Sequence, residues 1–117
     1  MLLTKEQIFA AQDLQSIDID IPEWGGSVKV RAMSAIDRIN FEKEQKDLQP
    51  SEMVLKLVLL TCIDDAGDRL FENDDLEQLQ LKSPNAILKI FNESIKLNVL
   101  NDKKIEEQAE NFQKDHS

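Results

Sequence analysis

The run Met53–Ile63 constrains the fold of this chain most strongly, because Lys56 and Thr61 are its only polar members. A helix that is apolar nearly all round belongs at the centre of a domain. The length of the run favours a helix over the alternative, a buried strand. The start signal Pro50-Ser51 places the predicted helix over 51–63. The run is shorter than the ~20 residues that span a bilayer, so it does not predict a membrane helix.

The 117-residue chain is long enough to bury such a helix in one domain. Covering the whole circumference of the helix is demanding for a monomer of this size, which favours self-association into a homo-oligomer. The single cysteine of the chain, Cys62, lies in this run and is interpreted as a small core residue.

Two alternating segments on either side of a Gly-Gly pair predict a β-hairpin over about 17–32. Residues 17–21 read Ile-Asp-Ile-Asp-Ile, and residues 28–31 read Val-Lys-Val-Arg. Gly25 and Gly26 supply a turn that tolerates positive φ. The acids of the first strand face the cations of the second if the register allows. A two-stranded hairpin is marginal in water, so its Ile/Val face must pack on helices.

Capping residues mark further helix starts, because Ser, Thr and Asn side chains satisfy the free N–H groups of a first turn. The starts are at Thr4, Ser34, Asn73 and Ser83, and the predicted helices run through Ala11 and over 35–46, 74–79 and 84–99. Asp64–Asp68 is a turn cluster that contains Gly67. The predicted fold class is α+β, mainly α: a single helical domain, 1–100, with an N-terminal β-hairpin.

Two features are open to a structural and a partner-binding interpretation. Trp24, at the apex of the hairpin, either folds back onto a helix or serves as an exposed anchor for a protein partner. Residues 101–117 form a polar tail with a thin apolar stripe at Ile105, Ala109 and Phe112. The stripe either closes over the core or stays frayed until a partner offers a groove, and we expect the tail to be partly disordered.

The charge balance excludes several classes of partner. The chain has 23 acidic and 14 basic residues, for a net charge of −9. Binding to phosphates needs clustered Lys and Arg, so neither nucleic acid nor an anionic membrane is an expected partner. One cysteine and one histidine, His116, exclude an internal disulfide and a Cys- or His-based metal site. The N-terminus lacks the pattern of a signal peptide, which favours a cytoplasmic location.

The acidic stretch 64–77 does not fit a calcium loop. An EF-hand that starts at Asp64 would need an acidic or amide side chain at Ala66 and glycine at Arg69. The stretch is therefore interpreted as a solvated turn followed by a helix N-terminus. The sequence contains no GxSxG, GxGxxG or phosphate-binding loop, and no histidine is placed to activate a serine. We expect no cofactor, no metal and no enzymatic activity.

Several motifs resemble those of tail assembly chaperones from long-tailed bacteriophages. Residues 21–31, Ile-Pro-Glu-Trp-Gly-Gly-Ser-Val-Lys-Val-Arg, are similar to the family's VPEWGG-x-V-x-V-R opening. Asp64–Phe71 resembles its D-x-x-G-x-R-L-F segment, and Asp74–Leu79 its D-D-L/V-x-x-L segment. The pieces occur in the family's order, and the resemblance extends from about Leu3 to Phe112.

This resemblance implies a chaperone without catalytic activity. Members of the family bind the long, helical tape measure protein, keep it soluble and help to recruit tail tube subunits, so the tape measure protein and the tail tube protein are the implied partners. They act in the host bacterial cytoplasm and are absent from the mature virion. The family's functional residues are not assigned by the resemblance, so Trp24, Ile105 and Phe112 are candidate contacts from this sequence alone. The alternatives are a minor structural tail protein or another small acidic protein-interaction module.

Overall fold

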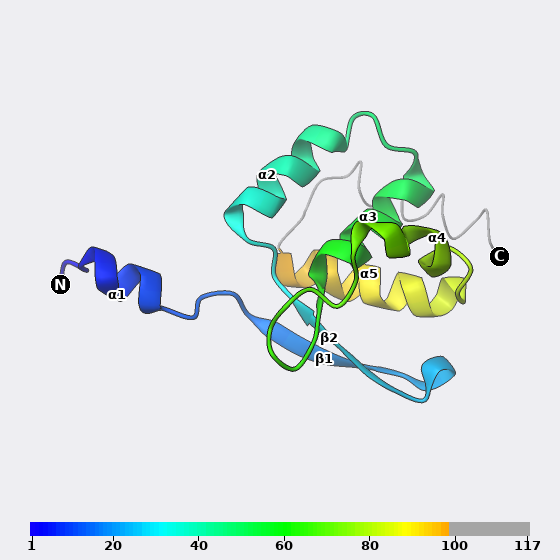
Figure 1. Ribbon diagram of the computed structural model, residues 1–117, viewed down its shortest axis with the longest axis horizontal. Helices are drawn as coiled ribbons and strands as arrows, with labels where there is room; N and C mark the ends of the chain where they lie inside the picture. The colour runs from blue at the N-terminus through cyan, green and yellow to red at the C-terminus, as the bar shows by residue number, and fades with distance from the viewer. Residues whose placement is uncertain (99–117) are drawn as a thin grey trace.

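The computed structural model describes residues 1–98, and the predicted tail with Ile105 and Phe112 lies outside the described residues. The described residues form an α+β arrangement that is mainly helical, with a β-hairpin near the N-terminus (Figure 1). The fold class and the N-terminal hairpin are thereby confirmed. The elements are α1 (Lys5–Ala10), β1 (Ser16–Ile21), η1 (Pro22–Trp24), β2 (Gly26–Arg31), α2 (Ala35–Glu44), α3 (Pro50–Thr61), β3 (Cys62–Ile63), η2 (Asn73–Asp75), α4 (Leu76–Leu79) and α5 (Pro84–Asn98), where η1 and η2 are 3-10 turns.

The hairpin strands belong to a three-stranded antiparallel sheet in the order β1-β2-β3. In the register of β1 and β2, Asp18 lies opposite Lys29, and their charged groups are 3.8 Å apart. Asp20 lies opposite Ser27 instead of a cation, so one of the expected charge pairs forms across the strands. Exposed ion pairs of this kind contribute little to stability, and their main effect is to favour one register of the two strands.

The helix predicted over 51–63 ends at Thr61, and the prediction was wrong for its last two residues. Cys62 takes an extended conformation, with φ −74° and ψ 131°. It then pairs with Val30 while Ile63 pairs with Lys29, which adds β3 to the sheet. The free edge of β2 offers hydrogen bonds that two more residues of helix could not reach, and local hydrophobicity does not reveal such a distant partner.

The core lies between the sheet and the two long helices α3 and α5 (Figure 1). Helix α5 packs against α3, β1 and β2, so it is as central to the domain as α3. Nearly the whole circumference of α3 is buried within the chain itself. The expectation of self-association depended on an apolar face of this helix that a monomer could not cover, and α3 has no such exposed face. The fully buried large side chains are Phe41, Phe91, Ile21, Met53, Leu57, Leu59, Ile87, Ile90, Val30, Val54 and Val58.

Side-chain capping interactions mark the starts of α1, α2 and α5. Thr4 and Gln7 form a reciprocal capping box: the Thr4 hydroxyl accepts from the Gln7 N–H at 3.2 Å, and the Gln7 side chain accepts from the Thr4 N–H at 2.9 Å. The Ser34 hydroxyl accepts from the Asp37 N–H at 3.3 Å. The Ser83 hydroxyl lies 3.5 Å from the Ala86 nitrogen. These side chains replace the hydrogen bonds that a first helical turn lacks.

The prediction that Asn73 caps a helix over 74–79 was wrong. Asn73 lies inside the 3-10 turn Asn73–Asp75, which precedes the short helix α4. The carboxylate of Asp75 accepts from the Glu72 N–H at 2.8 Å, so Asp75 closes this turn and Asn73 does not cap it. The side chain of Asn73 instead lies 3.4 Å from a guanidinium nitrogen of Arg69. No helix within residues 1–98 is both long and apolar enough to cross a membrane.

Candidate partner-binding surface

The tip of the β1–β2 hairpin places Trp24 between the core and solvent. Residues Pro22–Trp24 form a 3-10 turn that Gly25 ends, with its N–H donating to the Pro22 carbonyl at 3.1 Å. Gly25 has φ +74°, a left-handed conformation that is strained for residues with a Cβ atom. Gly26 begins β2 without a positive φ, so Gly25 is the residue of the pair that takes the left-handed conformation.

The Trp24 side chain is half-buried and packs against the hydrophobic core. It is therefore neither a fully enclosed core residue nor a free surface anchor. Its exposed part remains available to a partner, and its buried part fixes its orientation. Large aromatics that are rigid and partly exposed are typical of interface anchors.

The acidic turn after β3 is organised by its own backbone. The Asp64 carboxylate accepts from the N–H groups of Ala66 and Asp68, at 2.9 and 3.0 Å. The Asp64 N–H in turn donates to the Asp68 carbonyl at 2.8 Å, and Gly67 takes φ +87°. The acidic and glycine residues of this motif thus have a structural use in the turn. Within residues 1–98, no three His, Cys, Asp or Glu side chains gather in a way that could hold a metal ion.

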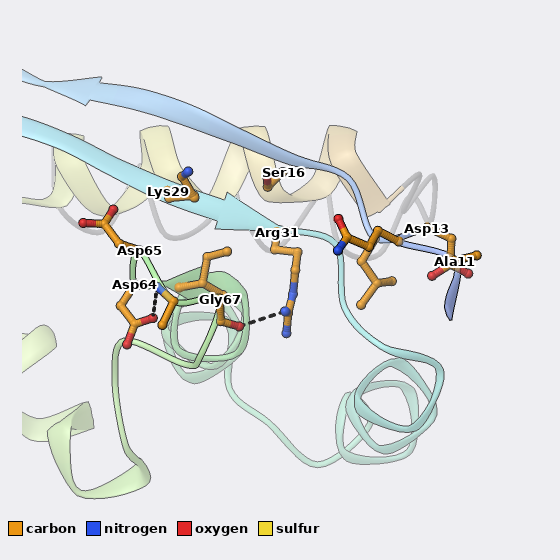
Figure 2. Close-up of a pocket in the computed structure, with 12 residues that line it drawn as sticks. Ala11, Asp13, Ser16, Lys29, Arg31, Asp64, Asp65 and Gly67 are labelled. Atoms are coloured by element: carbon orange, nitrogen blue, oxygen red, sulfur yellow. Dashed lines mark hydrogen bonds between the residues drawn. The ribbon is translucent and has the colours of Figure 1, made fainter. Parts of the chain in front are cut away.

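A groove of about 460 Å³ lies between this turn, the end of β2 and the segment that precedes β1 (Figure 2). The Arg31 guanidinium reaches across it and donates to the Gly67 carbonyl at 2.9 Å. Lys29 is engaged by Asp18, so both cations of the groove already have partners. The groove joins three segments distant in sequence and is lined by Ala11, Gln12, Asp13, Leu14, Ser16, Lys29, Arg31, Ile63, Asp64, Asp65, Ala66 and Gly67.

The groove is open to solvent, and its lining is mainly polar. Cys62, the single cysteine of the chain, directly precedes the groove residue Ile63, and its thiol is buried. Burial raises the pKa of this thiol from its ordinary value of 9.0 to about 12. A thiol that stays protonated is a poor nucleophile, which agrees with its interpretation as a core residue.

The N-terminal segment is a feature that the sequence interpretation missed. Helix α1 buries none of its residues, and Phe9 is 79% exposed. Met1, Leu2, Leu3 and Ile8 are exposed as well. The sequence showed a capped helix with apolar residues but did not show whether the domain covers them. The other candidate contacts, Ile105 and Phe112, lie beyond the described part of the chain.

Comparison with known proteins defines the class of fold. No protein-family profile matches the chain, and no curated protein matches it. Among solved structures, the fold is similar to that of the bacteriophage HK97 tail assembly chaperone, with a TM-score of 0.56 and 18% sequence identity over 83% of this chain and 93% of that one. At this identity the likeness shows the fold.

Proposed function

We propose that this protein is a bacteriophage tail assembly chaperone that binds the tape measure protein and helps to recruit tail tube subunits. One observation carries the proposal: 83% of the chain superposes on nearly the whole of the HK97 tail assembly chaperone. The PEWGG motif and the ordered motifs after it support the proposal independently, because sequence resemblance and fold similarity reach the same class of protein by different routes.

The physical character of the chain suits a chaperone. A net charge of −9 keeps it soluble and repels nucleic acid. The exposed apolar residues of the N-terminal segment and the half-buried Trp24 offer contacts to an apolar client. The proposed role needs no cofactor and no catalysis. It places the protein in the host bacterial cytoplasm during tail assembly and outside the mature virion.

The proposed client contacts are Trp24 on the domain and Ile105 and Phe112 in the C-terminal segment. Trp24 is held by the hairpin turn that Gly25 closes, so a contact there would be made by a positioned side chain. The C-terminal stripe has helical spacing, i and i+7, and would contribute if a client groove orders it.

Co-expression with the tape measure protein of the same phage genome tests this function. The tape measure protein should move from the insoluble to the soluble fraction and co-purify with this chain. An unrelated acidic protein of similar size and charge is the matched control, because it separates specific binding from the effect of charge. Equal insolubility of the tape measure protein with and without this chain would contradict the proposal.

A proteomic examination of purified virions separates the chaperone from the alternative of a minor structural tail protein. A chaperone is released before the tail is complete, so the chain should be missing from virions while it is abundant in the infected cell. Stoichiometric recovery with the tail would favour the structural role.

A further inference from the structure

We propose that residues 105–112 bind the outer face of α2 within the same molecule. The outer face consists of Ile36, Ile39 and Lys43, which share one side of the helix at positions i, i+3 and i+7. Ile36 is 61% exposed and Ile39 is 47% exposed, although both side chains are large and apolar. The opposite side of α2 is anchored in the core by the buried Phe41. The proposed contact does not depend on the chaperone function.

The outer face carries an unpaired cation on a strongly acidic protein. Two acids of α2 are already paired, because Glu42 lies 3.1 Å from Arg38 and Glu44 lies 3.7 Å from Lys56. Within residues 1–98, no ion pair involves the exposed Lys43. Since complementary charges select partners, an occupant that is apolar along one stripe and acidic beside it fits this face best.

Residues 105–112 have this composition. They read Ile-Glu-Glu-Gln-Ala-Glu-Asn-Phe, with three glutamates and no cation. Ile105, Ala109 and Phe112 have the i, i+4, i+7 spacing of one helix face. This stripe and the stretch Ile36–Lys43 match in length, since each corresponds to about 10 Å of helix axis. A helix this short is unstable in water by itself, so an apolar face to pack on would stabilise it.

The chain leaves the described domain beside α2. The Arg38 guanidinium donates to the Asn98 carbonyl at 2.9 Å, and the Asn98 side chain accepts from the Met33 N–H at 2.7 Å. In Figure 1 the end of α5, in orange, lies next to the start of α2. Residues 99–104 connect Asn98 to Ile105, a usual length for a helix–helix connection. They extend up to about 20 Å, whereas α2 is about 10–12 Å wide, so the stripe can reach the outer face.

The short connection favours this segment over a second copy as the occupant. A short tether holds the segment near α2 at an effective concentration of about millimolar, whatever the concentration of the protein. A second copy has no such tether, and both molecules carry a net charge of −9. The contact covers Ile105 and Phe112, so a client would have to compete with α2 for them. This last consequence alone rests on the proposed function.

A spin label at the end of the full-length chain tests the contact. Ser117→Cys places the label beyond the stripe, and the native thiol of Cys62 is buried. In nuclear magnetic resonance spectra, the label should broaden the amide signals of the outer face. The amide signal of Trp24, at the hairpin tip, is the internal control and should keep its intensity.

A mixed sample separates contacts within one molecule from contacts between molecules. It contains isotope-enriched protein without the label and labelled protein at natural isotope abundance. Only contacts between molecules can broaden its signals, so the outer face should keep its intensity.

Substitutions on both sides of the contact identify the side chains. Ile36→Asp and Phe112→Asp each remove an apolar side chain and add a charge. Each should lower the docking equilibrium constant about tenfold, as loss of an interface side chain does. Leu81→Asp, at a side chain that is 82% exposed and outside α2, is the matched control and should leave docking unchanged.

A charge reversal tests the electrostatic part. Lys43→Glu should weaken docking, because it places an acid beside the acidic stripe. Glu106→Lys, Glu107→Lys and Glu110→Lys together should restore docking in that background, because opposite charges then face each other again.

The proposal is overturned if the label leaves the signals of the outer face unchanged in the otherwise native chain. Equal broadening in the mixed sample would assign the face to a second copy and overturn it as well. Unchanged broadening in Ile36→Asp, or failure of the reversed glutamates to restore docking to Lys43→Glu, would have the same effect. Circular dichroism should show folded protein for the α2 variants, because their side chains are exposed.

Discussion

The side chain of Asn98 accepts a hydrogen bond from the backbone N–H of Met33 at 2.7 Å, across 65 residues of sequence. The amide nitrogen of Asn98 donates in turn to the Ser94 carbonyl at 2.7 Å. The Arg38 guanidinium donates to the Asn98 carbonyl at 2.9 Å. One buried residue near the end of α5 thereby ties together the end of the hairpin and the start of α2.

Replacing Asn98 by leucine should lower the free energy of unfolding by about 1–3 kcal/mol, because the Met33 N–H loses its acceptor in a buried position. Asn92→Leu, on the exposed side of the same helix, is the control and should change stability by less than about 0.5 kcal/mol. Urea unfolding followed by circular dichroism measures both. Equal stability of the two variants would show that Asn98 does not hold this junction.

The three glycines should differ in their tolerance of alanine. Gly25 and Gly67 have positive φ, and Gly26 does not. Alanine at either of the first two should cost about 1–2 kcal/mol of stability, because a Cβ strains the left-handed conformation. Gly26→Ala is the matched control and should be nearly neutral, since open space surrounds its Cβ position. Thermal unfolding compares the three, and a larger loss at Gly26 than at Gly67 would contradict the conformational explanation.

The Cys62 thiol should resist alkylation in the folded protein and react only after unfolding, because burial keeps it protonated. Its pKa is about 12 in the folded state against an ordinary 9.0. Between these values the unfolded chain binds fewer protons than the folded one, so stability should fall as pH rises from about 9 toward 12. Stability should not depend on this group below pH 9.

Cys62→Ala isolates this contribution, because every other ionisable side chain is unchanged in the variant. Its stability should decline less steeply between pH 9 and 11 than that of the wild type, in parallel urea titrations. Identical slopes, or rapid labelling of the native thiol, would show that the thiol is not buried as described.

Trp24→Ala should cost about 1–2 kcal/mol of stability, less than the roughly 3–5 kcal/mol of a fully buried aromatic, because the side chain is half-buried. The variant should fold and bind the tape measure protein more weakly. Trp24 is the single tryptophan, so fluorescence of the wild type should shift to shorter wavelength when the client covers it. An unchanged emission in the complex would remove Trp24 from the interface.

Local patterns in the sequence were sufficient for the hairpin and most helix starts. The alternation of residues 17–21 depends only on the two-residue period of a strand, and the caps at Thr4 and Ser34 depend on side chains three residues from their partners. Such interactions are short-range, so a single sequence contains all of their information. The end of α3 was predicted incorrectly because the strand Cys62–Ile63 exists through its pairing with Val30 and Lys29, far away in the chain.

The sequence by itself determined that this protein is an acidic, mainly helical domain with a β-hairpin, because composition and periodicity set charge and secondary structure. Only the tertiary structure decided which apolar residues are covered. Met53 and Phe9 are both apolar residues of helices whose starts the sequence predicted. Met53 is fully buried, whereas Phe9 is 79% exposed. Burial depends on what the folded chain brings alongside each helix, and this is a property of the whole packing.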